Sequence, residues 1–209
     1  MSKTRLESFS DGVIAVAITL LVLGITVPTP SAHHGLTHEL LRQWPAYAAY
    51  ALSFATIGII WINHHAVVGR LDRTDHVILL LNLLLLLCIG LVPFATSLMA
   101  TYLRNGRGES VAATVYAGTF LVVTVVFVAL NWHILFRKVH MLGVELAHAE
   151  RRKIVSRGLT GIVPYAAATG VAAVSPYATL AICAAIAVFY ASPLATGAAW
   201  QPVRARGQA

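Results

Sequence analysis

The chain contains a series of long apolar stretches, and this feature constrains its fold more than any other. A helix needs about 20 mostly apolar residues to cross a lipid bilayer. The stretches that come near this length are residues 11–27, 44–62, 77–101, 111–132, 159–174 and 177–194. The last two are rich in alanine, and Pro164 interrupts the fifth. The pattern predicts an all-α, polytopic membrane protein with six transmembrane helices, and five helices stay open as an alternative.

The composition excludes the other broad classes of protein. Hydrophobic residues make up 58% of the 209 residues and charged residues 11%, against about 45–50% and about 25% in soluble domains. An ordinary soluble domain and a disordered chain are therefore both excluded. No boundary or repeat divides the sequence, so residues 1–209 are expected to form a single six-span transmembrane domain.

The basic residues predict how the chain is oriented. With six crossings, Arg42, Arg104 and Arg107 lie on one side, and all the other Lys and Arg residues lie on the opposite side. Cytoplasmic loops carry the excess of Lys and Arg, so both termini are expected in the cytoplasm. The net charge of +7 thus reflects orientation, and no nucleic acid is expected as a partner. The run at residues 151–153 is expected to be an anchor of this kind, with binding of anionic lipid headgroups as the less favoured alternative.

Several kinds of chemistry lack their usual residues in this sequence. No Asp, Glu, Lys or Arg lies well inside the second to sixth stretches, where a charge costs roughly 2.5–3.5 kcal/mol and usually has a function. Protease and nucleotide motifs and the T-V-G-Y-G potassium filter do not occur, so an enzyme is not expected. Cys88 and Cys183 stand apart, and the adjacent pair His64-His65 points in two directions on a helix. We therefore expect no cofactor and no metal site.

The first stretch carries the most distinctive residues. Ser8 and Asp11 stand three apart, the spacing of a helix cap, and a carboxylate suits the start of a helix. A helix from Asp11 onward is apolar on every side, so its periodicity does not show which face would meet a pore. One face carries a stripe formed by Gly12, Val16, Thr19, Leu20, Leu23 and Val27.

Three stretches together carry a family resemblance. The first begins Arg5-Leu-Glu-Ser-Phe9-Ser10-Asp11 and continues Ala15-Val-Ala-Ile-Thr19. The second is Trp61-Ile-Asn-His64-His65, and the third contains Asn82 and Leu91-Val-Pro93-Phe94. Through these, roughly the first hundred residues resemble the bacterial branch of the transmembrane protein 175 family of potassium channels. The second half resembles the family only in its pattern of spans.

The resemblance implies a passive, modestly potassium-selective channel in the bacterial plasma membrane. It implies a homotetramer in the lipid bilayer, with the first helix of each subunit lining a central pore. The constriction would be made of apolar side chains instead of backbone carbonyls. By position these are Val16, Leu20 and Leu23, with the Thr19 hydroxyl between them; Val16 stands where the family usually has Ile. Potassium in the pore would be the one metal ion present.

The resemblance also implies a structural network at the cytoplasmic end. Its members would be Arg5, Phe9, Ser10, Asp11, Trp61, His64, His65 and Asn82. Pairing between Arg5 and Asp11 on one helix is unfavourable because they are six residues apart, so partners on other helices are expected. Two alternatives stay open. One is a proton-coupled carrier or proton pathway that uses Asp11 and His64/His65, and the other is a non-conducting membrane scaffold.

Overall fold

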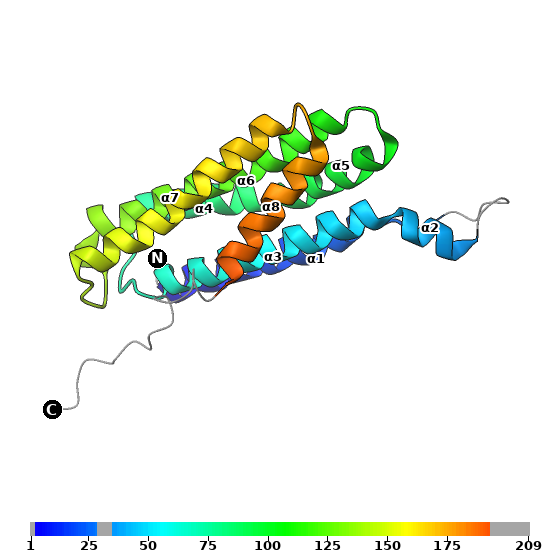
Figure 1. Ribbon diagram of the computed structural model, residues 1–209. Helices are drawn as coiled ribbons and strands as arrows, with labels where there is room; N and C mark the ends of the chain where they lie inside the picture. Colours follow the sequence, from blue (N-terminus) through cyan, green and yellow to red (C-terminus); the bar gives the residue numbers. More distant parts are fainter. Residues whose placement is uncertain (1–2, 29–34, 193–209) are drawn as a thin grey trace.

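The protein is a bundle of long helices that run roughly parallel or antiparallel to one another (Figure 1). The computed structural model describes residues 3–28 and 35–192, without the side chains of residues 104 and 105. Within these ranges there is no β-strand, and one isolated bridge pairs Leu71 with Leu142. The prediction of an all-α fold is confirmed for the described residues.

The first helix starts earlier than predicted. Helix α1 spans Lys3–Leu20 and continues as a 3-10 turn, η1, at Leu21–Gly24. The expected start at Asp11 was wrong because the polar residues before it also favour a helix, with Lys3 and Glu7 paired across one turn at 3.9 Å. Asp11 therefore lies inside the helix, and the capping role predicted for Ser8 and Asp11 was wrong as well.

The second and third stretches form long helices that lie beside α1. A short helix α2, Leu36–Arg42, leads into α3, Trp44–Val68, which runs six residues beyond the predicted end. The third stretch is divided into α4, His76–Gly90, and α5, Val92–Asn105, with Leu91 between them. The break lies next to Pro93, which lacks the backbone N–H needed to continue the hydrogen bonds of α4 but is tolerated in the first turn of α5.

The second half of the chain forms three more helices. Helix α6 spans Glu109–Trp132, and a π-helical turn η2, His133–Arg137, and a short turn η3, Val139–Met141, follow it. Helix α7 spans His148–Val171, so it begins eleven residues before the predicted start at Leu159 and passes through Pro164. Helix α8 spans Pro176–Ala191; the predicted end of the last stretch at residue 194 lies outside the described residues.

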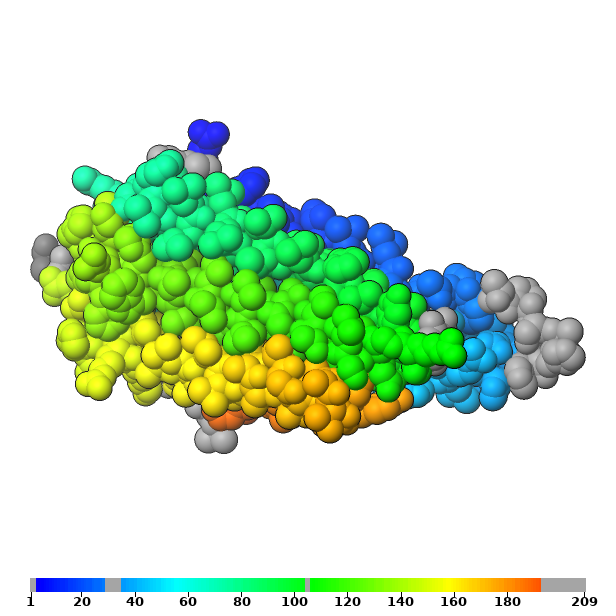
Figure 2. All heavy atoms as spheres, turned by 90° about the horizontal axis from the view of Figure 1, so that it is seen from above, coloured from blue at the N-terminus to red at the C-terminus, as the bar shows by residue number. Residues whose placement is uncertain are grey.

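Four helical segments of the described chain are long and apolar enough to cross a membrane. They are residues Lys3–Gly24, Trp44–Val68, His76–Leu103 and Glu109–Arg137, whereas α8 is apolar but shorter. Seen from above, α4, α6 and α7 follow one another across the face of the molecule, and α1 lies along the edge beyond α4 (Figure 2). Six crossings remain a prediction.

One end of the bundle gathers most of the described basic residues. There α3 ends, α4 and α7 begin and α6 ends, and the side chains of Arg70, Arg137, Lys138 and Lys153 lie near these helix ends. We call this the basic end of the bundle. The start of α1 lies there too, because the ammonium group of Lys3 donates a hydrogen bond to the carbonyl of Gly69.

Candidate functional site

Helix α1 has one face inside the bundle and one face outside it. The buried side chains recur every three or four residues, as expected for one side of a helix: Leu6, Ser10, Ile14, Ala17 and Leu21. The opposite side is apolar yet exposed, with Val16 at 56%, Leu20 at 44% and Leu23 at 72%. The structure therefore separates two faces that the sequence alone left equivalent.

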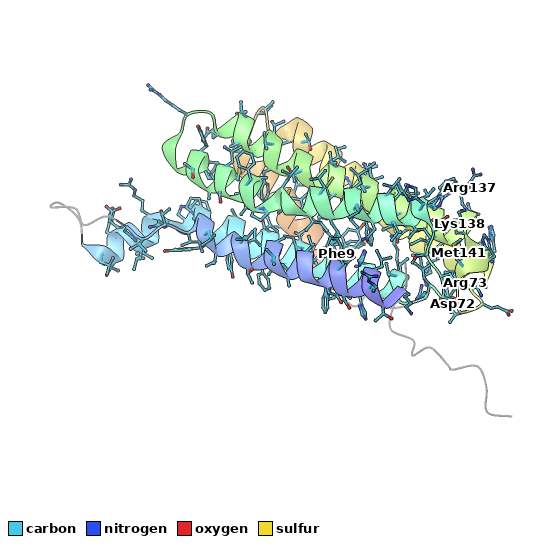
Figure 3. The ribbon with its side chains drawn as sticks, turned by 180° about the vertical axis from the view of Figure 1, so that it is seen from behind. Phe9, Asp72, Arg73, Arg137, Lys138 and Met141 are labelled. Carbon is cyan, nitrogen blue, oxygen red and sulfur yellow. The ribbon has the colours of Figure 1, made fainter. Side chains whose placement is uncertain are left out.

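The exposed face of α1 carries the Thr19 hydroxyl and borders a shallow groove. The Thr19 hydroxyl is exposed and donates a hydrogen bond to the carbonyl of Val16, at 2.9 Å. A shallow groove beside it is lined by α1 residues that include Phe9, Gly12 and Val16, and by Gly90 of α4. Phe9 is 49% exposed and projects from α1 in Figure 3. The face thus offers mostly apolar side chains, with the hydroxyls of Ser8 and Thr19 among them.

A buried chain of polar side chains joins α1 to two neighbouring helices. The Asn82 amide nitrogen on α4 donates to the Ser10 hydroxyl on α1, at 2.9 Å. The Asn82 oxygen lies 2.8 Å from Nε2 of His64 on α3. All three residues are at most 2% exposed. Each of the three side chains therefore has a hydrogen-bond partner. This avoids the loss of folding free energy that an unpaired polar group causes in an apolar interior.

Asp11 has a separate partner on α3. The indole nitrogen of Trp61 donates a hydrogen bond to a carboxylate oxygen of Asp11, at 2.8 Å. The His65 ring lies one turn further along, with its centroid 6.1 Å from the Trp61 ring. These interactions bring six of the eight expected network residues together. Arg5 and Phe9 are exposed side chains that belong to none of these hydrogen bonds.

A clasp at the basic end holds the connection between α3 and α4 against the connection between α6 and α7. The Lys138 ammonium lies 2.8 Å from the Asp75 carboxylate. The backbone nitrogen of Asp72 donates to the Met141 carbonyl at 2.8 Å. Asp72, Lys138 and Met141 lie at the same end of the molecule in Figure 3. The clasp was not predicted from the sequence, although an Asp such as Asp75 directly before an apolar run is a common helix-capping signal.

Asp75 is the best-supported charged group in the clasp. Partial burial alone would raise its pKa, but the hydrogen bonds from Lys138 and from the Ile78 amide outweigh it and lower the pKa below the ordinary value. The Ile78 bond, 2.8 Å long, also caps the start of α4. The carboxylate is therefore favoured over the neutral acid in the folded protein.

The fold and the exposed α1 face define a multi-pass helical membrane protein. The family described as "Endosomal/lysosomal potassium channel TMEM175" matches residues 5–93. A protein named as a potassium channel in Streptomyces collinus is 42% identical over 186 residues, which cover 89% of this chain and 90% of the relative. The chain belongs to the TMEM175 family, as its three characteristic stretches predicted.

Further comparisons extend this result to a solved structure and to animal proteins. The crystal structure of a lysosomal potassium-selective channel TMEM175 homolog from Chamaesiphon minutus has a TM-score of 0.79 and 38% identity. That match covers 90% of this chain and 96% of the solved chain. The endosomal/lysosomal proton channel TMEM175 of Gallus gallus is 38% identical over 117 residues, which cover 52% of this chain and 23% of that protein.

Proposed function

We propose that this chain is the subunit of a passive, potassium-permeable channel whose pore is lined by α1. The functional unit is a homotetramer in a bacterial plasma membrane, with six crossings per subunit and both termini in the cytoplasm. The bacterial relative's name as a potassium channel, with coverage of about nine-tenths of both chains, supports this proposal.

The exposed apolar stripe of α1 is the observation that carries the proposal. Val16, Leu20 and Leu23 are exposed on a helix whose other face is packed in the bundle. One subunit supplies one such helix, and a closed ring requires symmetric copies around an axis. Rings of apolar side chains can control ion passage by excluding water from a narrow pore.

In this proposal, the constriction is formed by Val16, Leu20 and Leu23. Their side chains offer no charge, so an ion passes only when the pore is wide enough for it to keep part of its water shell. The Thr19 hydroxyl donates to the Val16 carbonyl, and its oxygen keeps a lone pair that can face a hydrated cation. We expect modest discrimination of potassium from sodium.

The polar residues near the start of α1 have a positioning role in this account. The chain from Ser10 through Asn82 to His64 and the bond between Asp11 and Trp61 attach one side of α1 to α3 and α4. The opposite side of α1 is left free for the pore. Arg5 is exposed at the basic end and is available for contact with another subunit.

A proton pathway is the second candidate function, and one observation favours it. His64, Asn82 and Ser10 form a continuous hydrogen-bonded chain through the interior, and the Gallus gallus relative is named a proton channel. In that case Asp11 and His64/His65 would be the titrating groups. Flux that needs a proton gradient would favour this reading over a passive potassium channel.

Potassium flux into liposomes that contain the purified protein tests the proposal. A potassium gradient alone should drive flux, and Val16→Ala should raise its rate and lower the preference for potassium over sodium, because it widens the ring that the Val16 side chains form. Val22→Ala is the matched control, since Val22, in the turn η1 that continues α1, is also exposed, at 49%, but lies outside the stripe. Flux that is unaffected by Val16→Ala and Leu23→Ala would contradict the pore assignment.

A further inference from the structure

A cavity lies between α3, α6, α7 and α8, away from the proposed pore face of α1. Helix α8 leaves the end of α7 and runs obliquely toward α3, so that α7 and α8 separate toward the basic end (Figure 1). The Tyr190 hydroxyl on α8 still donates to the Arg157 carbonyl on α7, at 2.7 Å. The space that remains has a volume of about 130 Å³.

The lining of this cavity changes from charged to apolar along its length. At the basic end it includes Arg70, Lys153 and Arg157, together with the carboxylate of Glu150. Further into the bundle it includes Ile60, Phe127 and Ile186. Three cations stand against one carboxylate, so the charged end carries a positive excess. Within the described residues, no ion pair joins Glu150 to any of the three cations.

Asn131 provides an independent sign that the cavity receives a ligand. It lines the cavity from α6, is 3% exposed, and its Oδ1 has no hydrogen-bond partner among the described residues. Buried polar atoms are nearly always paired, and an unpaired one destabilises the fold. An occupant that donates a hydrogen bond, such as a hydroxyl group, would satisfy this oxygen.

These three properties together describe one kind of molecule. The cations require an anionic group, Asn131 requires a donor, and the deeper lining requires an apolar chain. We infer that the cavity binds a membrane phospholipid with an anionic phosphate and a hydroxylated headgroup, which is the chemistry of phosphatidylglycerol. At about 130 Å³, the cavity takes in only part of such a lipid, and the rest of the molecule lies outside it.

The position of the cavity at the basic end suits this occupant. Cationic side chains at the membrane surface attract anionic headgroups, and here the cations border an opening that continues into apolar surface. A lipid seated there contacts α3, the helix that also holds α1, directly through Trp61 and by way of Asn82 through His64. This links a lipid site to the helix that positions the proposed pore.

Native mass spectrometry and thermal melting of the purified, delipidated protein test the inference. Phosphatidylglycerol should bind in preference to phosphatidylcholine with the same chains, and it should raise the melting temperature more. Lys153→Ala and Arg157→Ala should each reduce this preference by about fivefold. Arg152→Ala is the matched control, because Arg152 is an exposed cation of α7 that does not line the cavity, and it should leave the preference unchanged.

A second variant separates ligand binding from a purely structural role. Asn131→Leu should raise the melting temperature of the delipidated protein and reduce the added stabilisation by phosphatidylglycerol. Glycerol 3-phosphate at the same concentration should not compete, because it lacks the acyl chain. Equal binding of both lipids, equal loss in Arg152→Ala and Lys153→Ala, or full competition by glycerol 3-phosphate would each overturn the inference.

Discussion

Asn82 is the residue on which the polar attachment of α1 depends most. It bonds Ser10 on one side and His64 on the other. Asn82→Ala leaves both buried partners unpaired, and we expect it to lower the free energy of unfolding by about 1–3 kcal/mol. Thermal unfolding in detergent measures this change. Asn63→Ala is the matched control, since among the described residues the Asn63 amide donates only to the Ile59 carbonyl of its own helix. Equal losses in the two variants would contradict this role of Asn82.

Asp75 makes the stability of the clasp depend on pH. Its pKa in the folded protein is lowered below the ordinary value of 3.8 by Lys138 and the Ile78 amide, despite partial burial. The stabilisation is therefore fully present above that ordinary value and is lost as the pH falls through the lower pKa of the folded protein. We expect it to be at most about 1 kcal/mol, because solvent screens a partly exposed pair.

Melting temperatures measured across acidic pH test the role of Asp75. Asp75→Asn keeps an acceptor for the cap, and it should flatten the acid-induced fall in melting temperature. Asp72→Asn should leave this fall unchanged, because the Asp72 side chain is 69% exposed in its pair with Arg73. A fall of the same steepness in wild type and Asp75→Asn would show that the carboxylate does not contribute as proposed.

At the scale of the element, the contact of α6 with α7 depends on a glycine. A Cβ atom added to Gly158 would lie 2.7 Å from Cγ2 of Val128, whereas one added to Gly170 on the same helix meets nothing within 4 Å. Gly158→Ala should therefore destabilise the protein by about 1–3 kcal/mol. Gly170→Ala should stabilise it by roughly 0.5–1 kcal/mol. Unfolding measurements that give both variants the same sign would contradict the packing described for α6 and α7.

The sequence predicted the elements unevenly, and the reasons are physical. The start of α3 at Trp44 was predictable because an apolar run begins there. The early starts of α1 and α7 lie among charged residues, and such residues are typical of loops. Helix α7 passes through Pro164 because contacts with α6 and α8 hold it. The free face of α1 could not be predicted, since its helix is apolar all round and only packing selects the buried side.

At the scale of the whole molecule, the described subunit leaves the apolar face of α1 exposed. Ser10, Asn82 and His64 were expected to act near one another from the family resemblance, and the structure supplies their hydrogen bonds. The cavity between α3, α6, α7 and α8 and the clasp were not expected, because their residues lie far apart in the sequence. In the proposed channel, symmetric copies of α1 surround an axis and together form the constriction.

Block of potassium flux by a thiol reagent at Leu23→Cys tests this central claim most directly. Cys88 and Cys183, which are both buried, are first replaced by alanine. A cationic, water-soluble thiol reagent should then reduce flux through Leu23→Cys to background, because the modified side chain occupies the pore. The same treatment of Val22→Cys, on another side of the helix, should leave flux intact. Complete modification of Leu23→Cys with unchanged potassium flux would contradict a pore lined by α1.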